Sequence, residues 1–201
     1  MVNIAVLISG SGTNLQAIID SWQNKEINGN LKLVVSNRKN AYGLERARLA
    51  GIEALHIKDE DLLIKTLEDN QIDLIVLAGY LAIVSDKLIN KFPNRIINIH
   101  PSLIPSFCGP GYYGIHVHEA AFKRGVKVSG ATVHFVSAVV DGGPIILQRT
   151  IDISDCKTPE EIQTKILLNI EHKLIVEAVK LYCDGKLRVN NERVEIIWKE
   201  H

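Results

Sequence analysis

The chain has 201 residues, 46% of them hydrophobic and 23% charged, which is enough to bury the core of one globular domain. Lysine plus arginine and aspartate plus glutamate are equal in number, so no overall charge favours a nucleic acid or an anionic membrane as a partner. Residues 1–9 show neither the basic region nor the small-residue cleavage site typical of a signal peptide, and no apolar run approaches the roughly 20 residues that span a bilayer. We therefore expect a cytoplasmic protein with a single domain over residues 1–201.

The first predicted unit is a buried strand over residues 4–8, a glycine loop over residues 9–14, and a helix whose apolar residues recur at helical spacing to Trp22. Glycines allow backbone N–H groups to approach an anion, and the helix N-terminus adds its dipole. Gly12, Thr13 and Asn14 are therefore candidate phosphate ligands. The alternative is a tight turn in which Thr13 or Asn14 caps the helix.

The same loop does not match a dinucleotide site. Leu15 occupies the position of the third glycine, and the second strand, residues 31–35, is not followed by the acidic residue that an NAD ribose requires. The pattern favours a monophosphate, although Arg38 and Lys39 leave an NADP site open.

Strands and helices then alternate, which indicates a doubly wound α/β fold with a mostly parallel sheet. The further predicted strands cover residues 54–57, 74–78, 96–100 and 128–136 and a strand that begins at residue 145; the predicted helices cover residues 42–50, 60–70, 85–91, 116–122 and 159–181. Residues 186–189 and 194–198 predict a small C-terminal hairpin.

The loop over residues 79–84 is unusually apolar for a connection at the end of a buried strand. Ligands of open α/β sheets bind beyond the carboxyl ends of the strands, so Leu81, Ala82, Ile83 and Val84 are candidates for the wall of a site for a flat apolar ligand. A loop packed into the core is the alternative.

Asn98 and His100 mark the candidate chemistry. They are two residues apart at the end of a predicted strand, so their side chains point to the same face. An amide and an imidazole side by side can polarise a carbonyl and move a proton. The alternative is a polar pair that satisfies the backbone of the following loop.

Asp141 lies in an apolar segment at a glycine turn. It is either a turn residue that accepts loop N–H groups or a carboxylate that faces His100. In the second case we expect it to fix the tautomer of the ring and to raise the pKa of His100 above about 6.5.

Two further patterns concern mobile and metal-binding groups. Residues 106–114, rich in glycine and aromatic residues, are predicted to form a lid or binding loop.

His116 and His118 have no acidic or cysteine ligand at a familiar spacing, so a metal site is not expected. The three cysteines are far apart and odd in number, which indicates reduced thiols.

Four motifs in this order resemble those of the folate-dependent formyltransferase family, and within it the phosphoribosylglycinamide formyltransferases of purine synthesis. They are Ser-Gly-Ser-Gly-Thr-Asn at 9–14, Asn-Ile-His-Pro-Ser-Leu-Ile-Pro at 98–105, Thr-Val-His-Phe-Val at 132–136 and Asp-Gly-Gly-Pro at 141–144. The resemblance covers nearly the whole chain and implies a Rossmann-like fold. It also implies a phosphoribosyl-binding half over residues 1–100 and a folate-binding and catalytic half over residues 101–201.

The resemblance also implies roles for single residues. Asn98, His100 and Asp141 match the catalytic trio of the family, with His118, His134 and Ser102 in support. The remaining residues implied in substrate binding are Gly12, Thr13, Asn14 and Glu171 for glycinamide ribonucleotide, and Leu81, Ala82, Ile83, Val84 and Val140 for the pteridine of 10-formyltetrahydrofolate.

The expected reaction is direct attack of the glycinamide ribonucleotide amine on the formyl carbon of 10-formyltetrahydrofolate, without a metal. The oxyanion would be stabilised by Asn98 and a protonated His100. A monomer or a homodimer is expected, with small-molecule partners and no nucleic acid or membrane. The rival hypotheses are a formyltetrahydrofolate deformylase, which transfers the formyl group to water, and a non-catalytic nucleotide-binding module.

Overall fold

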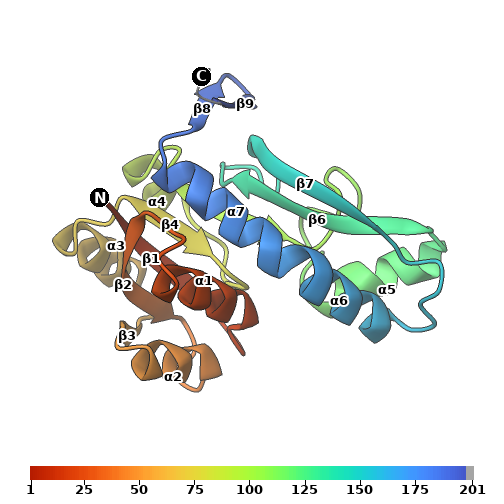
Figure 1. The fold of residues 1–201 in the computed structure, drawn as a ribbon, viewed down its shortest axis with the longest axis horizontal. Coiled ribbons are helices and arrows are strands. Elements are labelled where there is room, and N and C mark those ends of the chain that lie inside the picture. The colour runs from red at the N-terminus through yellow and green to blue at the C-terminus, as the bar shows by residue number, and fades with distance from the viewer. Residues whose placement is uncertain (198–201) are drawn as a thin grey trace.

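A seven-stranded sheet forms the centre of the computed structural model, which describes residues 1–197 (Figure 1). Its strand order is β3-β2-β1-β4-β5-β6-β7. The strands are β1 (Val2–Ile8), β2 (Gly29–Ser36), β3 (Glu53–His56), β4 (Leu74–Leu77), β5 (Ile96–His100), β6 (Val128–Phe135) and β7 (Ile145–Asp152). The first five are parallel to one another, whereas β6 is antiparallel to both β5 and β7. The predicted doubly wound, mostly parallel sheet is confirmed.

Both faces of the sheet are covered, which explains why its central strands are continuous apolar runs. Ile4, Val6 and Ile8 of β1 pack with the helices on one face, and Ala5 and Leu7 pack with those on the other; all five are fully buried. The helices are α1 (Thr13–Gln23), α2 (Tyr42–Leu49), α3 (Glu60–Asp69), α4 (Asp86–Lys91), α5 (Ile115–Arg124), α6 (Pro159–Ile166) and α7 (His172–Cys183). Figure 1 shows α1 and α7 side by side on the near face, where they contact each other.

The predicted long helix over residues 159–181 is not a continuous α-helix. A π-helical turn, η1 (Leu167–Glu171), separates α6 from α7. The apolar spacing gives no sign of this turn, because buried residues continue on the inner side of η1 through Ile170. Such a turn shifts the residues after it relative to an α-helix and often occurs at functional sites. Here it ends at Glu171, which is buried.

The C-terminal hairpin consists of β8 (Leu187–Asn190) and β9 (Arg193–Ile196), paired in antiparallel register. The predicted end of the hairpin at Trp198 lies outside the described residues. Among the helices of residues 1–197, none combines the length and apolar character required to cross a membrane.

Candidate active site

Asn98 and His134 form the first contact of the site, because β5 and β6 place them directly opposite each other. The Nδ2 of Asn98 lies 3.2 Å from the Nε2 of His134. The other ring nitrogen of His134, Nδ1, lies 2.9 Å from the backbone oxygen of Phe135, which only accepts hydrogen bonds. Nδ1 therefore carries the proton and Nε2 accepts from Asn98, which leaves the second amide hydrogen of Asn98 for another acceptor.

His100 has an acceptor at each ring nitrogen. Its Nε2 lies 2.9 Å from the backbone oxygen of Phe107, and its Nδ1 lies 3.6 Å from the Oδ2 of Asp141. The carbonyl requires a proton on Nε2, so a neutral ring has its lone pair on Nδ1, on the side of Asp141. Asp141 does face His100, as one of the two interpretations of the sequence expected.

The predicted direction of the His100 pKa is wrong. Burial of the ring, which is only 4% exposed, lowers the pKa of His100, and the nearby carboxylate of Asp141 and the carbonyl of Phe107 offset this only in part. Desolvation disfavours the charged imidazolium more than the single carboxylate favours it. The resting ring is therefore a neutral group that can accept a proton, not the protonated donor that the sequence suggested.

Asp141 is held by both the loop and the histidines. Its Oδ2 accepts a 2.9 Å hydrogen bond from the backbone N–H of Gly109, and its Oδ1 lies 3.7 Å from the Nε2 of His134. Burial alone would raise the pKa of this carboxyl, but contact with His134, the positive charge that His100 carries when it is protonated and the N–H of Gly109 together lower it. Asp141 also has a left-handed backbone, with φ of 56°. It is thus both a turn residue and a carboxylate directed at His100.

Ser102, one of the predicted supporting residues, bonds within the loop that follows β5. Ser102 is fully buried; its Oγ donates to the backbone oxygen of Ser106 at 2.6 Å, and its own carbonyl accepts from Thr132 Oγ1 at 2.7 Å. These bonds fix the start of the predicted lid, which reaches His100 through Phe107.

His118, on α5, is 1% exposed, and its Nδ1 has no hydrogen-bond partner among the described residues. Burial, with a smaller effect from the charge of His100, lowers the pKa of His118 to about 4. A ring that stays neutral at physiological pH suits the predicted supporting role next to His100.

The glycine loop differs from one of the two predictions made for it. Gly12 is the residue before α1, in a left-handed conformation with φ of 72°, and no side chain caps the helix. The expectation that Thr13 or Asn14 would be the cap is therefore wrong. A side chain at Gly12 would come within 2.8 Å of the Cα of Gly43 on α2, so the close approach of α2 requires glycine here.

Asn14 instead contacts Glu171, from the other end of the chain. The Nδ2 of Asn14 donates a 2.8 Å hydrogen bond to the Oε2 of Glu171, and both residues are buried. The Oδ1 of Asn14 is buried without a hydrogen-bond partner in the described part of the chain. Burial raises the pKa of Glu171 to about 7, against the lowering effect of Asn14. This contact joins the two predicted halves of the chain, residues 1–100 and 101–201.

The apolar loop over residues 79–84 presents its side chains to solvent. Leu81 is 46% exposed, Ile83 is 82% exposed, and Val140 on the Asp141 loop is 42% exposed. Ala82 and Val84 are half-buried. The alternative of a loop packed into the core does not hold for Leu81 or Ile83, which leaves apolar surface available to a ligand.

Several contacts of the site were not predicted. The carbonyl of Phe107 and the N–H of Gly109 are backbone groups, for which no side-chain pattern exists. Arg46 on α2 donates to the carbonyl of Ser11 in the glycine loop at 2.8 Å, and Ser9 bonds to two neighbouring loops. The pairing of His134 with Asn98 was also not predicted, because it follows from the antiparallel register of β5 and β6.

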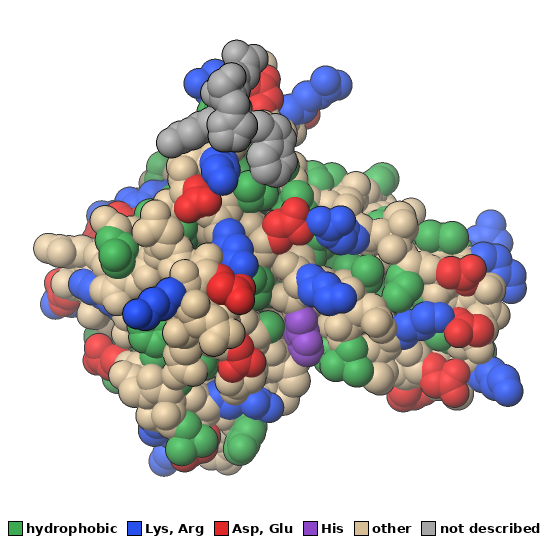
Figure 2. Space-filling view, viewed as in Figure 1, with side chains coloured by type: hydrophobic (Ala, Val, Ile, Leu, Met, Phe, Trp, Pro, Cys, Tyr) green, Lys and Arg blue, Asp and Glu red, His purple; other side chains and the backbone are tan. Residues whose placement is uncertain are grey.

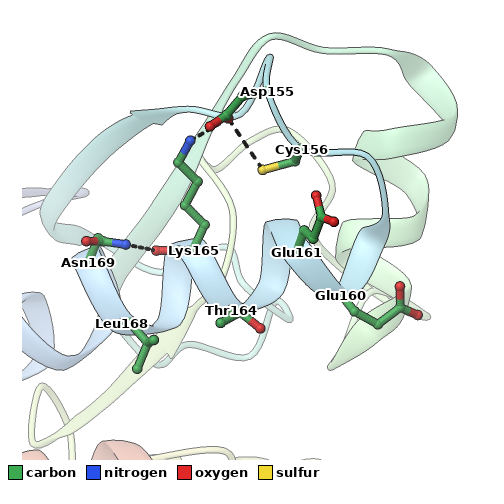
Figure 3. A pocket seen from close by; sticks show the side chains of 8 residues that line it. All are labelled: Asp155, Cys156, Glu160, Glu161, Thr164, Lys165, Leu168 and Asn169. Carbon is green, nitrogen blue, oxygen red and sulfur yellow. Dashed lines mark hydrogen bonds and ion pairs between the residues drawn. The ribbon is translucent and has the colours of Figure 1, made fainter.

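A hollow on the surface lies away from the predicted site residues. It lies beside α6 and is lined by Asp155, Cys156, Glu160, Glu161, Thr164, Lys165, Leu168 and Asn169, and Figure 3 shows the Lys165 ammonium turned to the Asp155 carboxylate. None of the predicted site residues lines it. Figure 2 shows basic and acidic side chains interspersed over the face crossed by α7. Within residues 1–197 no three His, Cys, Asp or Glu side chains are grouped as metal ligands would be.

Comparison with known proteins gives consistent matches over the chain. Residues 2–179 match the formyl transferase family model. The chain is 36% identical to a phosphoribosylglycinamide formyltransferase of Escherichia coli, covering 94% of this chain and 91% of that protein. It is 37% identical to the chloroplastic enzyme of the same name from Arabidopsis thaliana, covering 96% of this chain and 70% of that protein. A glycinamide ribonucleotide transformylase structure from Symbiobacterium toebii is 44% identical, with a TM-score of 0.91 over 98% of this chain and 94% of that chain.

Proposed function

The chain belongs to the formyl transferase family, and we propose that it transfers the formyl group of 10-formyltetrahydrofolate to the amine of glycinamide ribonucleotide in purine biosynthesis. The observation that carries the proposal is one buried cluster in which Asn98 meets His134 and His100 meets Asp141. A module that only binds nucleotides has no need of these buried polar groups, which are costly to place in a core.

The chemistry begins with attack of the amine on the formyl carbon, which generates a tetrahedral oxyanion. Asn98 is the proposed donor to this oxyanion, because its amide has one hydrogen left after bonding His134. The donor is held in place before the reaction by the paired strands β5 and β6, so little reorganisation is required when charge develops.

The proton of the attacking nitrogen must then reach the departing folate nitrogen. Neutral His100 is the proposed carrier, since its lowered pKa leaves it able to accept a proton at Nδ1. The resulting imidazolium would have Nδ1–H directed at Asp141 Oδ2 and Nε2–H directed at the carbonyl of Phe107. The Nδ1 proton would then pass to the folate nitrogen as its bond to the formyl carbon breaks, which restores neutral His100. Asp141 would therefore both orient the ring and stabilise its charged form.

The two substrates would bind on either side of this cluster. We assign the ribonucleotide phosphate to the backbone of Gly12, Thr13 and Asn14, and its sugar to Glu171, which already contacts Asn14. We assign the pteridine to the exposed apolar surface of residues 81–84 and Val140, which suits a flat apolar ring.

One spectrophotometric assay with both substrates tests the proposal. We expect tetrahydrofolate release that depends on glycinamide ribonucleotide and that yields formylglycinamide ribonucleotide in equal amount. Release without the ribonucleotide would instead identify a deformylase, and ribonucleotide binding without any release would identify a non-catalytic module.

A further inference from the structure

Ser9, the residue between β1 and the glycine loop, is 2% exposed and bonds to two other loops. Its Oγ donates to the Oδ1 of Asn37 at 2.7 Å and accepts from the backbone N–H of Leu81 at 2.8 Å. Its backbone N–H donates to the carbonyl of Gly79 at 3.0 Å. One serine thus connects the carboxyl ends of β1, β2 and β4, which are neighbours in the sheet.

The loop that Ser9 holds is anchored on either side of Leu81 by Tyr80 and Val84, which are partly buried against the core. The side chains of Leu81 and Ile83 are exposed, so packing against the core does not restrain them. Between these anchors the backbone at Leu81 has little side-chain packing, so its hydrogen bonds contribute most to its position. Ser9 supplies the bond at Leu81 N–H, directly at the start of the proposed pteridine surface.

Asn37 sets the direction of the serine hydroxyl. A hydroxyl has a single hydrogen, and Ser9 directs it to the Oδ1 of Asn37, which leaves its lone pairs for the N–H of Leu81. Without Asn37 the hydroxyl remains but is free to rotate, so the bond to Leu81 should weaken and not disappear.

We propose that Ser9 is a positioning residue that sets the spacing between the ribonucleotide loop, which begins at Gly10, and the pteridine loop, residues 81–84. This inference rests on the proposed function. The spacing matters because the folate must bind with its formyl carbon next to the amine of the ribonucleotide.

The test uses Ser9→Ala and Asn37→Ala in the full chain, with both substrates. We expect Ser9→Ala to raise the KM for 10-formyltetrahydrofolate about five- to tenfold, as for the loss of one hydrogen bond of ordinary strength, and to change the KM for the ribonucleotide less than about twofold. Asn37→Ala should raise the folate KM about two- to threefold. Exchange of the Leu81 amide with deuterium should be faster in both variants, and that of the Ile4–Ile8 amides unchanged.

Ser21→Ala is the matched control, because Ser21 is also a buried serine whose Oγ donates to a side chain, that of Glu26 at 2.9 Å. It should alter neither KM. Equal changes in both KM values for Ser9→Ala, or no change in the folate KM, would overturn the inference, and so would unchanged Leu81 exchange. If Ser9→Ala does not fold, the test rests on Asn37→Ala, and an unchanged folate KM in that variant would overturn the inference. Failure of the unaltered enzyme to use the two substrates would instead contradict the proposed function.

Discussion

Asp141 and Glu171 are two acidic side chains withdrawn from solvent, and their surroundings shift their pKa values in opposite directions. Burial acts to raise the pKa of both. Asp141 faces two histidines and the N–H of Gly109, which together lower its pKa. Within residues 1–197, Glu171 has the neutral amide of Asn14 as its one polar partner, and burial raises its pKa to about 7.

The difference shows that partners, and not burial alone, decide which carboxyl is charged at neutral pH. An ionised Asp141 suits a group that stabilises a transient imidazolium. A carboxyl that titrates near neutrality suits a group that exchanges hydrogen bonds with a bound sugar. Two carboxyl groups whose pKa values are shifted in opposite directions often have different roles in an active site.

The largest expected effect comes from removing the charge of Asp141. Asp141→Asn keeps the size of the side chain, and we expect kcat to fall about 10,000-fold, as in the carboxylate–histidine pair of serine proteases. Neither KM should change more than about threefold, because the lost interaction acts in the transition state. Steady-state kinetics measures both.

Asp59→Asn is the control for this substitution. Asp59 is a carboxylate outside the site that accepts the N–H of Leu62 at 2.8 Å. It should leave kcat unchanged. A near-normal kcat in Asp141→Asn would reduce Asp141 to a turn residue.

The next largest effect comes from Asn98, another member of the cluster that contains Asp141. Asn98→Ala should lower kcat about 100- to 1,000-fold, the usual loss for one oxyanion donor. Asn169→Ala removes a surface amide that bonds the carbonyl of Lys165 at 2.8 Å, and it should have no effect. A loss below about threefold in Asn98→Ala would assign the oxyanion to other donors.

Glu171→Gln tests the role of Glu171, the carboxyl with the raised pKa. Glutamine can still accept from Asn14 but never carries charge, so bonds from the sugar to a carboxylate are weakened. We expect the ribonucleotide KM to rise about tenfold, the lower end for a hydrogen bond to a charged group, with the folate KM unchanged. Glu177→Gln is the matched control, because Glu177 is a carboxylate on α7 that pairs with Arg149 outside the site. Similar rises in both KM values would argue for general damage to the fold.

The smallest expected effect is on stability, and its sign follows from the raised pKa of Glu171. The folded protein holds this proton more tightly than the unfolded chain, so the stabilisation from Glu171 is complete below about pH 4.5 and is lost as the pH rises through about 7. Above pH 7 the cost of the buried charge is at most roughly 3 kcal/mol.

Glu171→Gln should therefore unfold at higher urea concentration than the unaltered protein at pH 8, and at nearly the same concentration at pH 4.5. Acid destabilisation by His118, whose pKa is lowered to about 4, affects both proteins equally and cancels in the difference. A difference in stability that does not depend on pH would show that the Glu171 carboxyl titrates normally.

The sequence was sufficient for the parts of the structure that depend on local periodicity. Continuous β-branched runs predicted β1 and β4, and two-residue spacing placed Asn98 and His100 together at the end of β5. The strand order, and hence the pairing of Asn98 with His134, depends on long-range contacts that periodicity does not encode.

The direction of the His100 pKa shift was also predicted wrongly, because it too depends on contacts between distant parts of the chain. One carboxylate neighbour can be inferred from a motif, but the burial of the ring is a property of the whole fold. The bond from Asn14 to Glu171, 157 residues apart, follows from no local pattern; only the family resemblance indicated Glu171.

The most direct test of the account is a titration of the two carboxyl groups by NMR in protein labelled with ¹³C at the Asp and Glu carboxyl carbons, with Asp141→Asn and Glu171→Gln used to assign the signals. We expect Asp141 to titrate below about 3.9 and Glu171 to titrate at about 7. Titration of both groups near pH 4, or of Asp141 at higher pH than Glu171, would contradict it.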